Sequence, residues 1–193
     1  MTTTRGVGRP RVASRALLEE AACELFLEQG YAATSVAEVT MRAGVSRSTF
    51  FNYFDTKSDL LWTAFDEQVL ALAARLRDCS QTDSPRADVE RELRVFAADL
   101  GPDNVALAFA QESVMGLGED LRLAAVRRLA DVRDAVATHL RGRGATALAA
   151  EALGAALAGA LLAAVRAWSL RGPGRVALPE VLQEALDGVR ALD

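Results

Sequence analysis

The chain has 193 residues, 51% of them hydrophobic, and a formal net charge of −4 at pH 7. That length accommodates a small head of about 50 to 60 residues and one larger helical bundle with a sizeable core. Apolar residues recur at helical spacing and strand patterns are absent, so we expect an all-α fold.

The first fifteen residues carry positive charge only. They contain Arg5, Arg9, Arg11 and Arg15 and no acidic residue. Such a tail, with Gly-Arg-Pro before the first helix, can follow a phosphate backbone or enter a minor groove. A solvated tail without a partner is the alternative interpretation.

An amphipathic helix is expected over residues 17–31, and a second helix begins near Ser35. Ser35 and Glu38 form a capping box, in which hydroxyl and carboxylate each satisfy a free amide. An apolar stripe from Val36 to Ala43 follows, and Gly44 can adopt the left-handed conformation of a sharp turn. The second helix therefore ends at this glycine.

Ser46 is predicted to cap a third helix, whose polar side is separate from its aromatic residues. Two short helices joined by a glycine-containing turn can place the second of them in a major groove. Arginine suits the acceptors of guanine, asparagine suits adenine, and threonine can contact a thymine methyl. The polar side consists of Arg47, Ser48, Thr49 and Asn52. A plain helical hairpin is the alternative.

Residues 34–60, TSVAEVTMRAGVSRSTFFNYFDTKSDL, resemble the TetR-type repressor signature, and the resemblance extends back through residues 17–31. It covers about the first third of the chain. The resemblance implies a three-helix helix-turn-helix head that contacts both bases and phosphates. Base contacts are implied for Arg47, Ser48, Thr49 and Asn52, and phosphate contacts for Thr34, Tyr53 and Lys57, to which the tail adds Arg5, Arg9 and Arg11.

Three positions depart from that signature. Ser48 replaces a usual glycine, Phe51 a usual tyrosine, and Thr40 a small alanine. Phe51 cannot donate a hydrogen bond to a phosphate. We therefore expect the hydroxyl of Tyr53 to supply that contact instead.

We expect two domains: residues 1–57, the arm and DNA-binding head, and residues 58–193, an effector-sensing and dimerisation domain. Glycine, proline and serine punctuation divides the second domain into five or six predicted helices. The helix from residue 58 to about residue 78 would act as the lever that connects the head to the sensor.

Large side chains between residues 60 and 141 are candidates for an effector pocket, although core packing is the alternative for each. The effector would be a hydrophobic small molecule. Residues 50–54 and 59–66 resemble a subset of the TetR family thought to sense acyl-coenzyme-A-like compounds, and other bulky hydrophobic or aromatic compounds are the alternative. A regulator without a ligand also stays open. The candidates are Trp62, Phe65, Phe96, Phe109, Gln111 and Trp168, with Glu112, Met115, Arg127 and Arg128 as further residues.

The alanine-rich stretch at residues 145–168 is long and apolar enough to raise a membrane hypothesis. Glu151, Arg166 and the dominance of alanine and glycine favour a packed helix instead. With the last helix it is predicted to form a two-fold dimer interface, as the TetR resemblance implies. The interface residues would be Leu153, Leu157, Leu161, Leu182 and Leu186.

The combined expectation is a ligand-responsive regulator that binds a palindromic operator as a homodimer, most simply as a repressor, although activation stays open. Catalysis is disfavoured, because His139 is the only histidine and no triad can be proposed. Cys23 and Cys79 lie too far apart for a CxxC pair or a four-cysteine zinc site. Neither cofactor nor metal is expected. With free thiols and no apolar leader, a cytoplasmic location is expected. A purely architectural DNA-binding protein is a third class.

Overall fold

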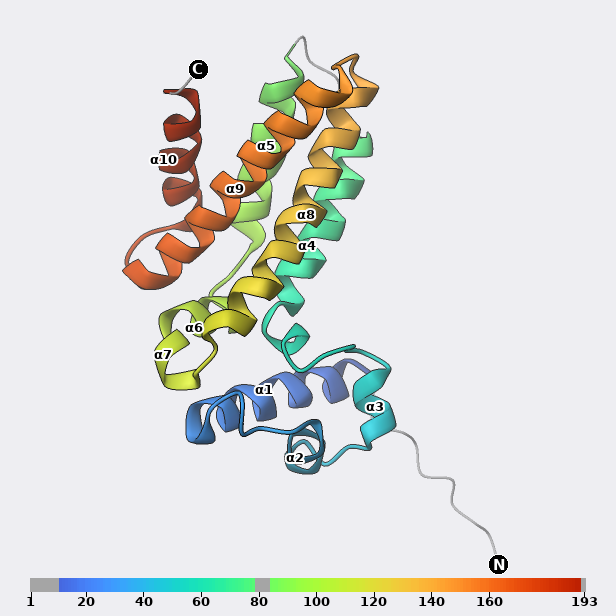
Figure 1. Ribbon diagram of the computed structural model, residues 1–193, viewed down its shortest axis with the longest axis vertical. Coiled ribbons are helices and arrows are strands. Elements are labelled where there is room, and N and C mark those ends of the chain that lie inside the picture. The colour runs from blue at the N-terminus through green and yellow to red at the C-terminus, as the bar shows by residue number, and fades with distance from the viewer. Residues whose placement is uncertain (1–10, 79–83, 192–193) are drawn as a thin grey trace, which may run out of the picture.

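The computed structural model describes residues 11–78 and 84–191, and these form a small helical head at one end of a longer helical bundle (Figure 1). The smaller part contains α1 (Arg11–Gln29), α2 (Val36–Arg42) and α3 (Arg47–Phe51). The only β-pairing among the described residues is an isolated bridge between Pro173 and Val176. The expectation of an all-α fold with a three-helix head is confirmed.

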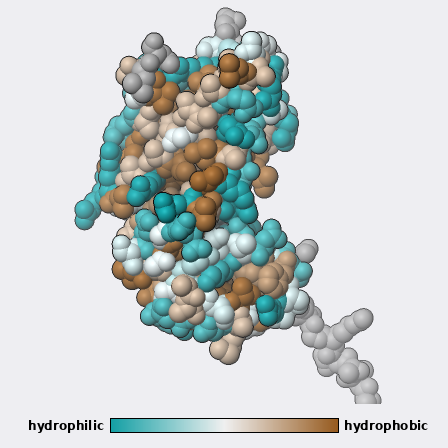
Figure 2. Space-filling view, viewed as in Figure 1, coloured by the Kyte–Doolittle hydropathy of each residue, from teal (hydrophilic) through white to brown (hydrophobic). Residues whose placement is uncertain are grey.

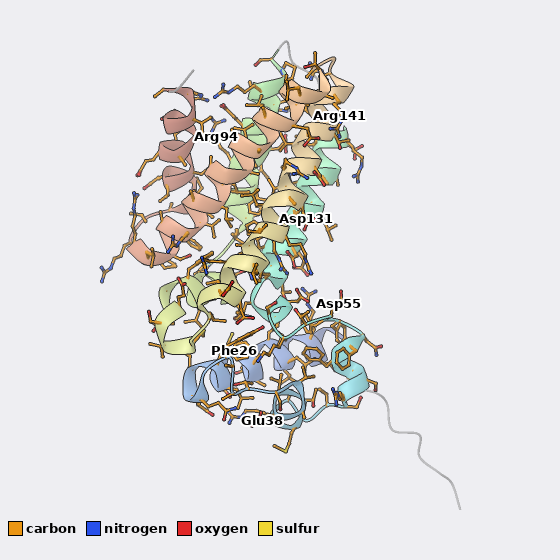
Figure 3. The ribbon with its side chains drawn as sticks, in the orientation of Figure 1. Phe26, Glu38, Asp55, Arg94, Asp131 and Arg141 are labelled. Atoms are coloured by element: carbon orange, nitrogen blue, oxygen red, sulfur yellow. The ribbon has the colours of Figure 1, made fainter. Side chains whose placement is uncertain are left out.

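The head is held by the caps and the aromatic core that its sequence predicts. The amide of Ser35 donates to Glu38 Oε2 (2.7 Å) and the amide of Glu38 donates to Ser35 Oγ (3.2 Å), which completes the capping box. Gly44 has a φ of +64°, the left-handed conformation expected at the turn. Phe26, labelled in Figure 3, packs edge-on against Tyr31 with ring centroids 5.1 Å apart.

Within the described residues, seven α-helices make the larger part, against the five or six helices predicted, and one short 3₁₀ helix, which contacts both α1 and α6, connects the two parts. The chain bends at Gln111, which separates two short helices that the sequence pattern does not distinguish. The elements are η1 (Asp59–Leu61), α4 (Thr63–Asp78), α5 (Pro85–Asp99), α6 (Asn104–Ala110), α7 (Glu112–Met115), α8 (Gly118–Gly142), α9 (Ala147–Arg171) and α10 (Leu178–Arg190).

Helix α9 is the central helix of the bundle and contacts α6, α8 and α10. Gly154 permits the close approach to α8, because a Cβ at this position would lie only 3.0 Å from the carbonyl oxygen of Arg133. Among the described residues, α9 alone has the length and composition of a membrane span. Its packing against three neighbours is that of a core helix.

Burial within the single chain corrects the prediction that these leucines form the dimer interface. Leu157, Leu161, Leu182 and Leu186 are each 0% exposed within the single chain, because α10 packs its apolar side against α9. These side chains therefore form intramolecular core. Leu153 is half-buried and also packs against that core.

Candidate nucleic-acid interface

Helix α3 presents the predicted base-reading side chains to solvent. Ser46 Oγ accepts a hydrogen bond from the amide of Thr49 (3.1 Å), which fixes the start of the helix. Arg47, Ser48 and Asn52 are exposed and Thr49 is half-buried. The polar face of α3 is thus free to enter a groove, as the sequence predicts.

Phe50 anchors the opposite face of α3. Its side chain is fully buried, and its ring lies 5.6 Å from the ring of Phe54 and 5.1 Å from that of Phe51. Because Phe50 is held in the core of the head, the orientation of the exposed residues around the helix axis is fixed. Cys23, also predicted to be core, is buried in the same head, and burial raises the pKa of its thiol to about 12.

Two predicted phosphate contacts have other partners in the structure. Thr34 is 2% exposed and its hydroxyl donates to the carbonyl of Gly30 (2.9 Å). Lys57 Nζ donates to the carbonyls of Tyr31 (2.5 Å) and Thr34 (3.0 Å) and lies 4.0 Å from the centre of the Tyr31 ring. Burial lowers the pKa of Lys57. Lys57 thus ties the α1–α2 corner to the loop after α3, whereas the hydroxyl of Thr34 bonds within that corner. The burial of Thr34 corrects its assignment, and the phosphate contact of Lys57 stays a prediction.

Of the remaining predicted phosphate-contacting side chains, the structure describes only that of Tyr53. Tyr53 is half-buried and packs against the core of the head. Arg5 and Arg9 lie outside the described residues, and so does the side chain of Arg11, although its backbone begins α1. Arg15 has acidic partners instead, since it donates to Glu19 (3.1 Å) and Glu67 (2.7 Å).

An ionic cluster centred on the buried Arg128, which we call the clamp, joins the head to the bundle. It consists of Asp59 at η1, Asp66 on α4 and Arg128 on α8. The guanidinium of Arg128, 1% exposed, donates twice to Asp66 (2.9 and 2.7 Å) and once to Asp59 (3.0 Å). It also lies 5.0 Å from the ring centre of Trp62.

The second oxygen of Asp59 extends the clamp towards α3. It accepts hydrogen bonds from the amide (2.9 Å) and hydroxyl (2.8 Å) of Thr56, in the loop that leaves the reading helix. Burial alone would raise the pKa of Asp59, but the bonds from Thr56 and Arg128 outweigh it and hold the pKa below its ordinary value. Asp59 is therefore charged at neutral pH and connects the head to α8.

The predicted aromatic effector pocket is filled by its own side chains. Trp62 packs edge-on against Phe65 (5.4 Å) and Phe109 (5.8 Å), and Phe65 against Phe96 (5.1 Å). All four are at most 6% exposed. Trp168 is 4% exposed and donates to the carbonyl of Val176 (3.1 Å) beside α10. These residues therefore pack in the core, and among them only Phe109 also borders a groove.

The polar candidates separate into different sites. Gln111 is half-buried at the bend between α6 and α7. Phe109 and Glu112 border a groove of about 350 Å³ between α8 and α9. Arg128 belongs to the clamp, whereas Arg127, whose side chain is 55% exposed, donates to Asp59 (3.2 Å) and borders a larger groove.

That larger groove, of about 760 Å³, lies between α4 and α8, and Asp131 in Figure 3 marks its α8 side. Its volume is within the range of small-molecule sites in proteins. His139 Nδ1 is hydrogen-bonded to the carbonyl of Leu76 (2.8 Å), while the buried Nε2 has no partner. The lining contains both apolar and charged residues: Asp66, Val69, Leu70, Ala73, Leu76, Arg77, Arg127, Asp131, Asp134, Ala135, Thr138, His139, Gly142 and Arg143.

A smaller groove of about 340 Å³ continues from this site to the head. Asp66, Leu70 and Arg127 border both grooves, and the smaller one reaches Asn52 and Tyr53 beside α3. Among the effector-pocket candidates predicted from sequence, only Arg127 borders these two grooves. One signal was available, because Leu70 lies at a solvent-facing position of α4 and is 73% exposed.

Such a head, with an exposed, capped reading helix on a helical bundle, defines a helix-turn-helix DNA-binding regulator. The sequence model for bacterial regulatory proteins of the TetR family matches residues 18–62, and the model described as the MftR C-terminal domain matches residues 93–192. The chain belongs to the TetR family. That family consists of DNA-binding transcriptional regulators, and the chain is accordingly not an enzyme.

Curated relatives agree on the class but not on the direction of control. The chain is 34% identical over 93 residues to an HTH-type transcriptional repressor of Mycobacterium tuberculosis, which is 48% of each chain. It is 33% identical over 78 residues to the HTH-type transcriptional activator FasR of Mycolicibacterium smegmatis, 40% of this chain and 36% of that protein. The chain thus matches at most about half the length of these relatives.

A solved structure is similar over nearly the whole chain. It is Thermus thermophilus FadR, a TetR-family transcriptional repressor in complex with lauroyl-CoA, which is 26% identical with a TM-score of 0.57. The similarity covers 91% of this chain and 92% of that one.

Proposed function

We propose that the chain is a homodimeric repressor that binds a palindromic operator and is released by a small hydrophobic effector held in its bundle. The observation that carries the proposal is the clamp, because it links the loop after the reading helix to α4 and α8, the helices that border the groove of about 760 Å³. As a bacterial regulator it would act on DNA in the cytoplasm.

The proposed dimer face is the side of α9 that α8 and α10 leave open. Small residues at helical spacing allow two helices to approach closely, and Leu148 is 81% exposed at one end. Figure 2 shows hydrophobic side chains along the middle of the bundle, in the region of α8 and α9. The face would consist of Leu148, Ala152, Ala155, Gly159, Leu162 and Ala163.

We place the effector in the groove between α4 and α8. Val69, Leu76 and Ala135 are among its apolar lining residues, and eight of the fourteen lining residues are polar or charged. Apolar side chains bury the body of a ligand, and polar groups fix its orientation. Similarity to a regulator that was solved with lauroyl-CoA supports an acyl-CoA-like compound as the first candidate, and other hydrophobic compounds are the alternative.

The proposed mechanism is a shift between two conformations of the dimer. A ligand between α4 and α8 would change the separation of Asp66 and Arg128, and therefore the position of Asp59 and the head. An allosteric coupling of about 1 to 3 kcal/mol changes affinity roughly 5- to 150-fold. Without effector, the dimer would hold its two heads at the distance that fits the two half-sites.

Operator binding is tested by footprinting the full chain on the DNA flanking its own gene. We expect a protected segment with two symmetric halves, and release by a hydrophobic compound that also raises the melting temperature. Binding to all duplexes with equal affinity would instead support an architectural protein.

Sedimentation tests the dimer separately. Ala155→Glu should yield monomers at micromolar concentration, while Ala147→Glu, at an exposed position that is not three or four residues from any member of this face, should leave the dimer intact. A wild-type monomer would contradict the proposed pairing.

A further inference from the structure

We propose that Phe51 is a specificity-determining residue, which contacts a thymine methyl in each half-site and orients Arg47 for the neighbouring base. The proposal goes beyond binding to an operator, since it assigns part of the sequence preference to an apolar side chain.

Phe51 lies at the end of α3 with half of its side chain in water. It is 51% exposed, whereas the adjacent Phe50 is fully buried. The two rings are packed edge-on with centroids 5.1 Å apart and an interplanar angle of 80°. The buried ring therefore supports the exposed one, and Phe51 has a defined position on the surface of the reading helix.

Arg47 and Phe51 are four residues apart and share one face of α3. The guanidinium carbon of Arg47 lies 5.7 Å from the centre of the Phe51 ring, within the range of a cation–π contact. Arg47 has no salt-bridge partner among the described residues. Phe51 is thus the group that restrains the arginine before DNA binds.

Each member of this pair has a natural target in the major groove. Arginine bonds to O6 and N7 of guanine, and a phenyl ring makes apolar contact with the C5-methyl of thymine. Side chains at this spacing on a helix are about 6 Å apart, and successive bases along one strand rise by about 3.4 Å. The pair is therefore suited to a thymine and a guanine separated by one or two base steps.

The alternative is that Phe51 only packs against the sugar-phosphate backbone. A backbone contact carries no sequence information directly, so its loss would weaken binding to every duplex. A base contact by Phe51 depends on the C5-methyl group of one thymine. Removing that methyl from the DNA distinguishes base reading from backbone packing without altering the protein.

The experiment uses the full chain and the operator selected from a random duplex library. Each thymine of one half-site is replaced in turn by uracil, which removes only the methyl, and affinity is measured by fluorescence anisotropy. We expect one uracil position to lower affinity about three- to fivefold, the effect of one buried methyl group. Replacing a guanine one or two steps away with 7-deazaguanine, which lacks N7, should also weaken binding.

Protein variants complete the test. Phe51→Ala should bind the thymine and uracil duplexes equally well, while Phe51→Tyr, which keeps the ring, should retain the preference. Met41→Ala is the matched control, since Met41 is 77% exposed on α2 and outside the reading helix. It should leave the uracil profile unchanged.

The proposal is overturned if no uracil position affects the wild type, or if Phe51→Ala keeps the same preference. Equal weakening of selected and random duplexes by Phe51→Ala would assign the residue to the backbone instead. In each case operator binding by the wild type would still stand, so failure here is distinct from failure of the proposed function.

Discussion

Replacing Arg128 with methionine removes the cation of the clamp while keeping most of the volume of the side chain. The guanidinium is 1% exposed and forms hydrogen bonds to Asp66, Asp59 and the carbonyl of Ala124 (3.3 Å). Its loss leaves Asp59, whose side chain is 10% exposed, without its buried partner. We expect the free energy of unfolding to fall substantially.

The structure also bounds the size of that fall. Removing one partner of a buried ion pair costs about 3 to 5 kcal/mol. The side chain of Asp66 is 37% exposed and can return to water, and Asp59 keeps its bonds from Thr56. The lower limit, about 3 kcal/mol, is therefore expected.

Arg127→Met is the matched control. Arg127 is adjacent in sequence and also contacts Asp59, but its side chain is 55% exposed. Exposed ion pairs contribute at most about 1 kcal/mol. The two variants thus compare the same chemistry at two degrees of burial.

Urea unfolding monitored by circular dichroism, at one fixed protomer concentration, measures both variants. The Asp59→Asn/Arg128→Met double variant should regain part of the loss, because the unpaired buried charge is then removed. If Arg128→Met cost no more than Arg127→Met, the clamp would not be the element that holds the head to the bundle.

Three further predictions concern single side chains. Arg47→Ala should weaken specific operator binding by about 1 to 3 kcal/mol and non-specific binding less, as measured by anisotropy on selected and random duplexes; equal losses would contradict base reading. Burial raises the pKa of Asp103 to about 6, so the free energy of unfolding should fall by at most about 3 kcal/mol as the pH rises from about 4 to 6. Asp103→Asn should remove this fall in unfolding curves recorded across that range, and an unchanged pH profile would refute the assignment. Gly154→Ala should destabilise the fold by about 1 to 3 kcal/mol, because its Cβ would meet the Arg133 carbonyl. Gly188→Ala, in open space on α10, should stabilise the fold by about 0.5 to 1 kcal/mol. Thermal melts measure both variants, and no difference between them would refute the packing argument.

The head could be predicted from sequence because its determinants are local. The capping box of Ser35 and Glu38, the left-handed Gly44 and the cap at Ser46 act within a few residues. The exposed positions on α3 follow from helix periodicity once its first residue is known. Thr34 was misassigned because burial by α1 depends on tertiary packing that no local pattern records.

The bundle shows the opposite case. Apolar periodicity identifies Leu157 and Leu182 as members of a buried face, but it does not reveal whether the neighbour is the same chain or a second copy. In the same way, large aromatic residues such as Phe65 indicate a core and not a cavity. The groove between α4 and α8 arises from the relative placement of two helices, which sequence spacing does not fix.

The most direct test of the central claim, that α3 reads base edges in the major groove, is methylation interference on the selected operator. Methylation of guanine N7 should block binding at symmetric positions in both half-sites, and with Arg47→Ala at least one position per half-site should lose this effect. Interference confined to adenine N3 in the minor groove, or a pattern that Arg47→Ala leaves unchanged, would contradict the account.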